Sequence, residues 1–100
     1  MTRSQVLLRA RRGAGEELRH EVDRLEVLLA TREQPGLLGL ELLVSEDDPD
    51  ELLVAASWSS TEHYERWRSS AVRETLLREL DDLLAAEPEV RVYRVVDAAG

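Results

Sequence analysis

Four segments of this sequence share a repeat of two residues, and that repeat limits the fold more than any other feature. Successive side chains of a β-strand point to opposite faces of a sheet, so this spacing predicts strands. In the first segment Val6, Leu8 and Ala10 alternate with a different set of side chains. The four predicted strands cover residues 4–11, 37–44, 51 to 57 or 58, and 90–96.

The stretch between the first two predicted strands instead repeats every three to four residues, which is the period of a helix with one apolar face. Gly13 and Gly15 precede this stretch, and Pro35-Gly36 follows it. The pattern predicts one helix from Glu16 to about residue 32. Its apolar positions are Leu18, Val22, Leu25 and Leu29.

A second helical region follows the third predicted strand and is interrupted once. Ser59 and Glu62 are spaced as a capping box for a short helix over about residues 61–69. Ser69-Ser70 can then cap a further helix, which runs to about residue 86 before a proline. The apolar positions predicted for that helix are Val72, Leu76, Leu80, Leu83 and Leu84.

The predicted elements follow in the order strand, helix, strand, strand, helix, strand. That order is typical of the ferredoxin-like split β-α-β fold (βαββαβ), an α+β architecture in which a four-stranded antiparallel sheet carries both helices on one face. A chain of 100 residues is too short for two domains with separate cores. We therefore expect a single domain over residues 1–100.

The other face of the predicted sheet carries apolar side chains that no helix covers. A second copy of the chain, packed face to face about a twofold axis, would bury this surface. We therefore expect a homodimer. Arg9 and Arg11 alternate onto the same face, whereas Arg94 falls among the valines of the helix-facing side. The apolar residues predicted for the open face are Leu7, Leu43, Leu53, Ala55, Tyr93 and Val95.

Charge and side-chain chemistry exclude several classes of function. The chain has 13 basic and 21 acidic residues, a net charge of -8, so we expect no nucleic acid partner, because phosphate binding needs a basic surface. With no cysteine and two histidines, it can form no disulfide, no thiolate metal site and no all-histidine metal triad within one chain. No apolar run approaches the roughly 20 residues of a membrane span, and no targeting signal is evident, so we expect a cytoplasmic protein with no membrane partner.

The region around the two tryptophans has the most specific pattern. It reads W-x-S-x-E-x-(aromatic)-x-x-W-x-x-S and resembles the corresponding region of the antibiotic biosynthesis monooxygenase superfamily. The resemblance extends over nearly the whole domain, because Pro35-Gly36 and Gly15-Glu16-Glu17-Leu18 also match. It implies a dimeric α+β barrel and a monooxygenase that oxidises an aromatic, polyketide-like small molecule without a cofactor. The matching residues are Trp58, Ser60, Glu62, Tyr64, Trp67 and Ser70.

The same region is similar to that of the Isd-type haem-degrading monooxygenases. Their pocket uses a tryptophan, a histidine and a first-strand asparagine. The resemblance places Trp67 at the tryptophan position, Leu77 at the histidine position, and Leu8 at or near the asparagine position. Leu77 cannot ligate iron and Leu8 cannot hydrogen-bond bound oxygen, so haem is disfavoured and no cofactor is expected. The cofactor-independent enzymes commonly rely on an asparagine beside the tryptophan, and this chain has none.

Trp67 and His63 are the candidate catalytic residues, His63 because histidine is the residue type suited to accept a proton near neutral pH. The substrate-binding candidates are Tyr64, Trp67, Leu8 and Leu77. Tyr64 and Trp67 are three residues apart and therefore share a helix face. We expect both rings to face a cavity between the second helical region and the sheet, with the first strand as its floor.

Two classes of function fit these residues. The first is an oxygenase, in which a deprotonated aromatic carbon acid reacts with O2 by electron transfer. The second is a non-catalytic ligand-binding dimer on the same fold, with haem binding as a variant that Trp67 and the fold support. The missing asparagine and histidine favour the second, since a fold does not fix a function. The same side chains also have structural interpretations: Trp58 as core, Tyr64 as packing between helix and sheet, and His63 as solvated.

Overall fold

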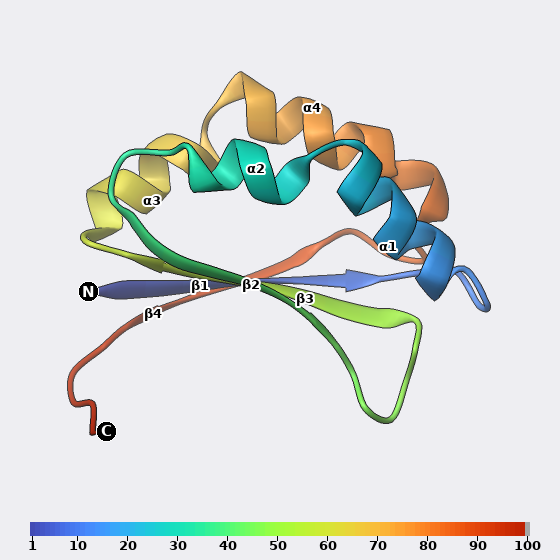
Figure 1. Cartoon of the computed structure of the whole chain (residues 1–100), viewed down its shortest axis with the longest axis horizontal. Helices are drawn as coiled ribbons and strands as arrows, with labels where there is room; N and C mark the ends of the chain where they lie inside the picture. Colours follow the sequence, from blue (N-terminus) through green and yellow to red (C-terminus); the bar gives the residue numbers. More distant parts are fainter. Residues whose placement is uncertain (100) are drawn as a thin grey trace.

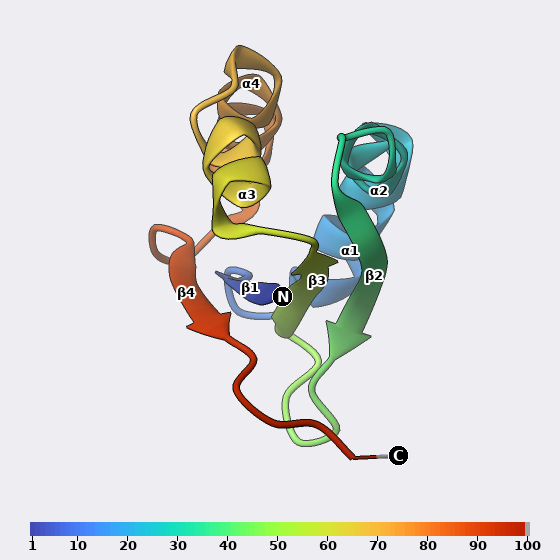
Figure 2. The same ribbon diagram turned by 90° about the vertical axis from the view of Figure 1, so that its left-hand side faces the viewer.

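The chain, described over residues 1–99 by a computed structural model, forms one antiparallel four-stranded sheet with all its helices on one side (Figure 1). Figure 2 shows the helices as two pairs, α1 with α2 and α3 with α4, above the sheet. The predicted α+β fold and its split β-α-β order are confirmed. The elements are β1 (Thr2–Arg9), α1 (Gly15–Arg24), α2 (Val27–Arg32), β2 (Leu37–Val44), β3 (Glu51–Trp58), α3 (Thr61–Arg68), α4 (Ala71–Leu80), a 3-10 turn (Asp81–Leu83) and β4 (Glu89–Arg94).

The strand order is β2-β3-β1-β4, so β1 and β3 are central. Ser4 lies opposite Ala56 and Leu8 opposite Leu52, and all four point toward the helices and are buried. Arg94 lies opposite Thr2 in the edge strand β4, on the helix-facing side that its alternation predicted, and it is exposed. The central strands therefore supply the floor on which the helices pack.

The predicted helix over residues 16–32 is wrong in one respect, because the chain forms two helices there. Glu26, between α1 and α2, has a φ of 55°, a left-handed conformation that is uncommon for a residue with a side chain. The chain changes direction at this point, so the apolar face does not continue along one axis. Leu18 and Val22 are fully buried, whereas Leu29 is 45% exposed.

The last predicted helix is also too long, since α4 ends at Leu80 and a 3-10 turn follows. Hydrogen bonds hold the next residues to the end of β1 instead: the Arg11 N–H donates to the Leu83 carbonyl at 2.8 Å, and the Ala85 N–H donates to the Arg9 carbonyl at 2.8 Å. These bonds compete with continued helix and carry the chain back to the sheet. At the other end of this segment, β4 ends before the predicted residue 96 and leaves Val95 outside the strand.

A bulge in β2 changes which leucines face the helices. Leu37 lies opposite Trp58 and Gly39 opposite Ser57, so Leu38 is an extra residue with a 58% exposed side chain. Strict alternation placed Leu37 and Leu40 on opposite faces of the sheet. The bulge brings both to the helix side, where they pack near Trp58.

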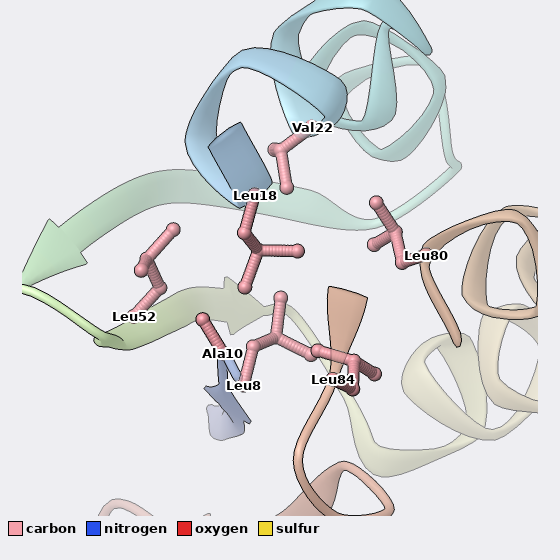
Figure 3. Close-up of a cluster of buried hydrophobic side chains, with 7 residues drawn as sticks. All are labelled: Leu8, Ala10, Leu18, Val22, Leu52, Leu80 and Leu84. Atoms are coloured by element: carbon pink, nitrogen blue, oxygen red, sulfur yellow. The ribbon is translucent and has the colours of Figure 1, made fainter. Parts of the chain in front are cut away.

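One apolar cluster joins α1 and α4 to the central strands (Figure 3). In Figure 3, Leu18 and Val22 point down from α1 toward Leu8 and Leu52, and Leu80 approaches from α4. Full burial of each such leucine contributes about 1.5–3 kcal/mol. No helix within residues 1–99 is long and apolar enough to cross a membrane.

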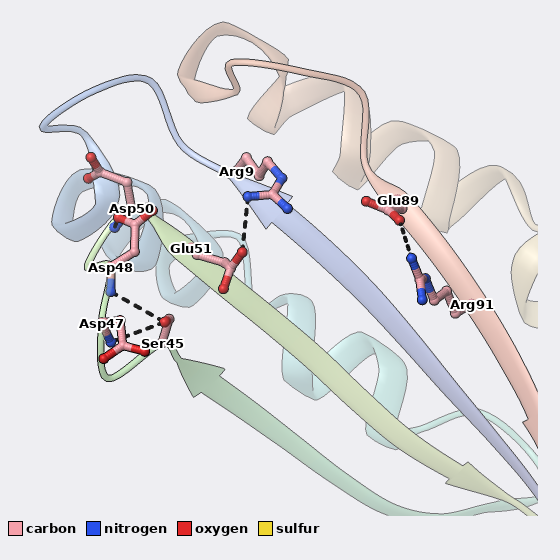
Figure 4. Close-up of polar contacts among 8 residues, drawn as sticks. All are labelled: Arg9, Ser45, Asp47, Asp48, Asp50, Glu51, Glu89 and Arg91. Atoms are coloured by element: carbon pink, nitrogen blue, oxygen red, sulfur yellow. Dashed lines mark hydrogen bonds and ion pairs between the residues drawn. The ribbon is translucent and has the colours of Figure 1, made fainter.

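No helix of residues 1–99 covers the far face of the sheet (Figure 1). The register places Leu43, Leu53 and Leu7 side by side across β2, β3 and β1. Two ion pairs share this face (Figure 4), one between Arg9 and Glu51 at 3.0 Å and one between Arg91 and Glu89 at 2.9 Å. The open face is thus an apolar row with charged neighbours, and less uniformly apolar than the alternation predicted.

Candidate functional site

A small apolar cavity lies between the sheet and the helices, with a volume of about 50 Å³. Residues of β1 and β3 form its floor, and residues of α2, α3 and α4 form its walls. The cavity therefore lies between the sheet and both helical pairs of the fold. The lining residues are Ser4, Val6, Leu8, Val27, Thr31, Val54, Ala56, Trp58, Tyr64, Trp67, Arg73, Leu76, Leu77 and Leu80.

Two aromatic rings of α3 form one wall of the cavity. Tyr64 and Trp67 are 1% and 7% exposed, and their three-residue spacing places both on the inner face of the helix. The Tyr64 ring meets Trp58 edge-on, with ring centroids 6.0 Å apart and an angle of 65° between the ring planes. Trp58 is itself fixed, because its Nε1 donates to the Ser4 Oγ at 3.0 Å in a buried hydrogen bond. This wall is aromatic and held from below by the sheet.

Two buried polar atoms at the cavity have no hydrogen-bond partner within residues 1–99, the Tyr64 hydroxyl and Nη2 of Arg73. Burial raises the pKa of Tyr64, because a phenolate is poorly solvated there, and the positive charge of Arg73 partly opposes this effect. Burial also lowers the pKa of Arg73, and the neighbouring charge of Arg68 acts in the same direction. An arginine nonetheless stays protonated in proteins. The cavity thus combines an apolar body with one positive charge.

Arg73 was not among the site residues predicted from the sequence, although the helical spacing indicates its inner position. Counting back from Leu80 in steps of three and four gives Leu77, Leu76 and Arg73, all of which line the cavity. The sequence-based assignment began that face at Val72, which is 53% exposed. The predicted apolar face was therefore wrong by one residue at its start, because an arginine was not considered for an inner position.

The sequence profile of the family described as "Antibiotic biosynthesis monooxygenase" matches residues 1–78. The chain belongs to this family. The matched region includes every residue that lines the cavity except Leu80. No curated protein sequence matches the chain.

Solved structures agree with this antibiotic biosynthesis monooxygenase fold. A Deinococcus radiodurans protein, named as a candidate member of the same family, is 18% identical with a TM-score of 0.86, over 100% of this chain and 97% of that one. A Mycobacterium tuberculosis protein is 22% identical with a TM-score of 0.81, over 99% and 98%. SnoaB of Streptomyces nogalater, named as a cofactor-independent oxygenase, is 18% identical with a TM-score of 0.77, over 97% and 94%. At these identities the likeness shows the fold alone.

Among the residues selected from the family pattern, Leu8, Tyr64, Trp67 and Leu77 meet at the cavity. His63 does not line it. Adjacent residues of a helix point about 100° apart, so the side chain before Tyr64 is directed elsewhere.

His63 lies instead against the start of the helix and the turn before β2. Its Nδ1 is 2.7 Å from the Ser60 Oγ and 3.1 Å from the Ser59 Oγ. The ring also packs so closely on Gly36 that a Cβ there would lie 2.3 Å from the imidazole. Ser60, whose Oγ accepts from the His63 N–H, caps α3, so the capping residue is one position later than Ser59.

The lining of this family member's cavity is poorly suited to haem iron. Within residues 1–99 it contains no histidine, cysteine or methionine, the side chains that most often ligate that metal. Leu8 and Leu77 lie in the lining and add only apolar surface.

Proposed function

We propose that this chain is a cofactor-independent monooxygenase that oxidises a small aromatic, polyketide-like carbon acid with O2. The observation that carries the proposal is the apolar cavity walled by Tyr64 and Trp67, because two neighbouring rings offer an aromatic substrate both contact area and orientation. Family membership supports it, and so does the likeness to SnoaB, which is named as a cofactor-independent oxygenase.

The proposed reaction needs no external reductant. An activated methylene group of the substrate loses a proton, and the resulting carbanion transfers one electron to O2. The radical and superoxide combine to a peroxide, which takes up a proton and loses water to leave a carbonyl. In balance, one CH2 group and one O2 give one C=O group and one water molecule. A mainly apolar cavity favours this sequence because it limits the contact of water with the reactive intermediates.

The proposal gives no part in proton transfer to His63, since that side chain does not line the cavity. It also requires the cavity to enlarge. An engineered cavity that binds benzene has a volume of about 150 Å³, whereas this cavity has about 50 Å³. Only Ser69 and Ser70 separate α3 from α4, so we propose that α4 moves relative to α3 to admit the ring.

Oxygen uptake with a hydroxyanthrone, 1,8-dihydroxyanthrone, tests this function. We expect protein-dependent uptake of one O2 per anthrone oxidised, an anthraquinone absorbance spectrum, and incorporation of one oxygen atom from labelled O2. The rate should be unchanged by a metal chelator. Heat-denatured protein provides the control for autoxidation, and a rate equal to that control contradicts the proposal.

A non-catalytic ligand-binding module is the second candidate, and one observation favours it. No histidine, aspartate or glutamate lines the cavity within residues 1–99, so the cavity walls offer no carboxylate or imidazole as a general base. Saturable binding of the anthrone under nitrogen, without protein-dependent oxygen uptake in air, would select this alternative.

We also propose that the chain acts as a homodimer through the open sheet face. Leu53 is the centre of the apolar row on that face, between Leu7 and Leu43. Light scattering at micromolar concentration should give twice the chain mass of 11.4 kDa. Leu53→Arg should give the monomer mass, because it places a charge in the buried row. The matched control is Leu38→Arg at an exposed bulge position, and a monomeric wild-type protein would remove the proposal.

A further inference from the structure

Two polar groups at the cavity have no hydrogen-bond partner within residues 1–99. They are the Tyr64 hydroxyl and Nη2 of Arg73, and both are buried. Buried polar atoms are nearly always hydrogen-bonded, and each exception calls for an explanation. We propose that Arg73 and Tyr64 form an anion-binding site, which holds a carboxylate or phenolate oxygen of an aromatic ligand whose ring lies in the cavity.

The unused hydrogen-bonding groups at the cavity include two donors suited to an anion, on Arg73 and Tyr64. The Ser4 hydroxyl already accepts from Trp58, and the Thr31 hydroxyl donates to the Val27 carbonyl at 2.8 Å. Arg73 offers several N–H donors and Tyr64 an O–H donor, and an anionic oxygen can accept from both. A neutral aromatic ligand would leave the guanidinium charge without a partner.

Nothing in the described chain neutralises Arg73. It makes no ion pair within 4.0 Å with any carboxylate of residues 1–99, and it is the only charged side chain of that range that lines the cavity. Arg78, on the same helix, instead pairs with Glu74 at 3.0 Å on the surface. Several exposed arginines of that range also lack an ion pair, but Arg73 differs from them because it lines the cavity and its Nη2 is buried.

Arg73 and Leu77 line both the cavity and a larger surface hollow of about 370 Å³, and they lie between the two spaces. That hollow lies between α4 and the start of β4, and its other lining residues are apolar or carry charges of both signs. They are Pro88, Val90, Arg68, Arg78, Glu74, Asp81 and Glu87. Movement of Arg73 and Leu77 would connect the two spaces. An anionic group would then be bound at the entrance, with the ring of the ligand directed inward toward Tyr64 and Trp67.

This inference rests on the proposed function and adds the charge of the substrate to it. It also explains how the reaction could proceed although the cavity walls contain no general base. A positive charge beside an acidic group lowers the pKa of that group. An enol held by Arg73 would therefore bind as its enolate and release its proton to solvent. The enolate is the same anion as the carbanion that reacts with O2, so no separate base in the cavity is needed. The chain carries a net charge of -8, so its surface in general repels anions and adventitious binding is disfavoured.

Benzoate and benzamide provide a matched pair of probes, because they share a ring and differ in charge. Calorimetric titration of the wild-type protein should show benzoate binding at one site per chain, about tenfold or more tighter than benzamide. Arg73→Met, which keeps the length and apolar stem of the side chain, should weaken benzoate binding about tenfold and leave benzamide binding unchanged. Arg73→Gln provides a second variant in case the first fails to fold.

Arg24→Gln is the matched control, because Arg24 lines neither the cavity nor the hollow, and it should leave both affinities within about twofold, since its ion pair with Glu21 lies on the surface. Tyr64→Phe should weaken benzoate binding without loss of stability, because the hydroxyl it removes has no partner. No saturable benzoate binding, equal affinity for the two probes, or a preference for benzoate that survives both Arg73 variants would overturn the site.

Neither probe has an oxidisable methylene, so these titrations test the anion site apart from catalysis. Benzoate preference together with no anthrone oxidation would retain the anion site and remove the oxygenase. Anthrone oxidation together with equal binding of benzoate and benzamide would retain the oxygenase and remove the anion site.

Discussion

Trp67→Ala is expected to abolish protein-dependent oxygen uptake with the hydroxyanthrone and to lower the free energy of unfolding by about 3–5 kcal/mol. Trp67 is 7% exposed, packs in one cluster with Trp58 and Tyr64, and lines the cavity. Alanine therefore removes both a core side chain and one aromatic wall of the site. Urea unfolding and oxygen uptake, measured on the same preparation, give the two effects.

Trp67→Phe separates these two roles, because phenylalanine keeps an aromatic wall while losing part of the volume. We expect a smaller loss of stability, about 1–2 kcal/mol, and measurable oxygen uptake. Val72→Ala, at an exposed position of α4, should change neither quantity. A folded Trp67→Ala protein with wild-type turnover would contradict the placement of the substrate against this ring.

The strands could be predicted from the sequence because their side-chain repeat directly reflects burial. Alternation in β1 and β3 placed Leu8, Leu52 and Trp58 correctly on the helix-facing side. Two backbone irregularities could not be predicted in the same way. A single left-handed residue at Glu26 and a single extra residue at Leu38 leave the pattern of apolar residues nearly unchanged, although each redirects the side chains that follow or precede it.

The candidate site, too, could be predicted from the sequence only in part. The three-residue spacing of Tyr64 and Trp67 fixes their shared helix face, and the family resemblance selected Leu8 and Leu77, which line the same cavity. Arg73 was missed because the sequence-based prediction left polar residues on the surface, although the helical period counted back from Leu80 places Arg73 on the inner face of α4. His63 was predicted as catalytic because histidine can accept a proton near neutral pH. Its position next to Tyr64 in the helix, however, already indicates that its side chain points away from the cavity.

Asp50→Ala is expected to lower the free energy of unfolding by about 2–4 kcal/mol, a large effect for a polar residue in a turn. The Asp50 carboxylate accepts two hydrogen bonds, from the Gly13 N–H at 2.9 Å and from the Gly15 N–H at 2.9 Å. Gly15 begins α1, and the residue before it, Ala14, provides no side-chain cap. The turn between β2 and β3 therefore caps a helix that lies 35 positions earlier in the sequence.

Close packing makes this contact hard to replace. A Cβ at Gly15 would lie 2.0 Å from the Pro49 carbonyl oxygen, so the helix start and the turn meet backbone to backbone. Hydrogen bonds to a charged group contribute about 1.5–3 kcal/mol each, and partial exposure of this pair reduces the total. Loss of the carboxylate leaves two backbone N–H groups at this junction without their acceptor.

Asp47→Ala is the matched control, because Asp47 lies in the same turn and its carboxylate makes no hydrogen bond or ion pair within residues 1–99, although its N–H donates to Ser45 (Figure 4). Urea midpoints at equal protein concentration should fall for Asp50→Ala and stay near wild type for Asp47→Ala. The effect should also reach the cavity, since α1 leads directly into α2, whose Val27 and Thr31 form part of its wall. Equal stability of the two variants would contradict this prediction. It would mean that α1 is held by its apolar face alone, through Leu18 and Val22, and that the turn connects β2 and β3 without stabilising the helix.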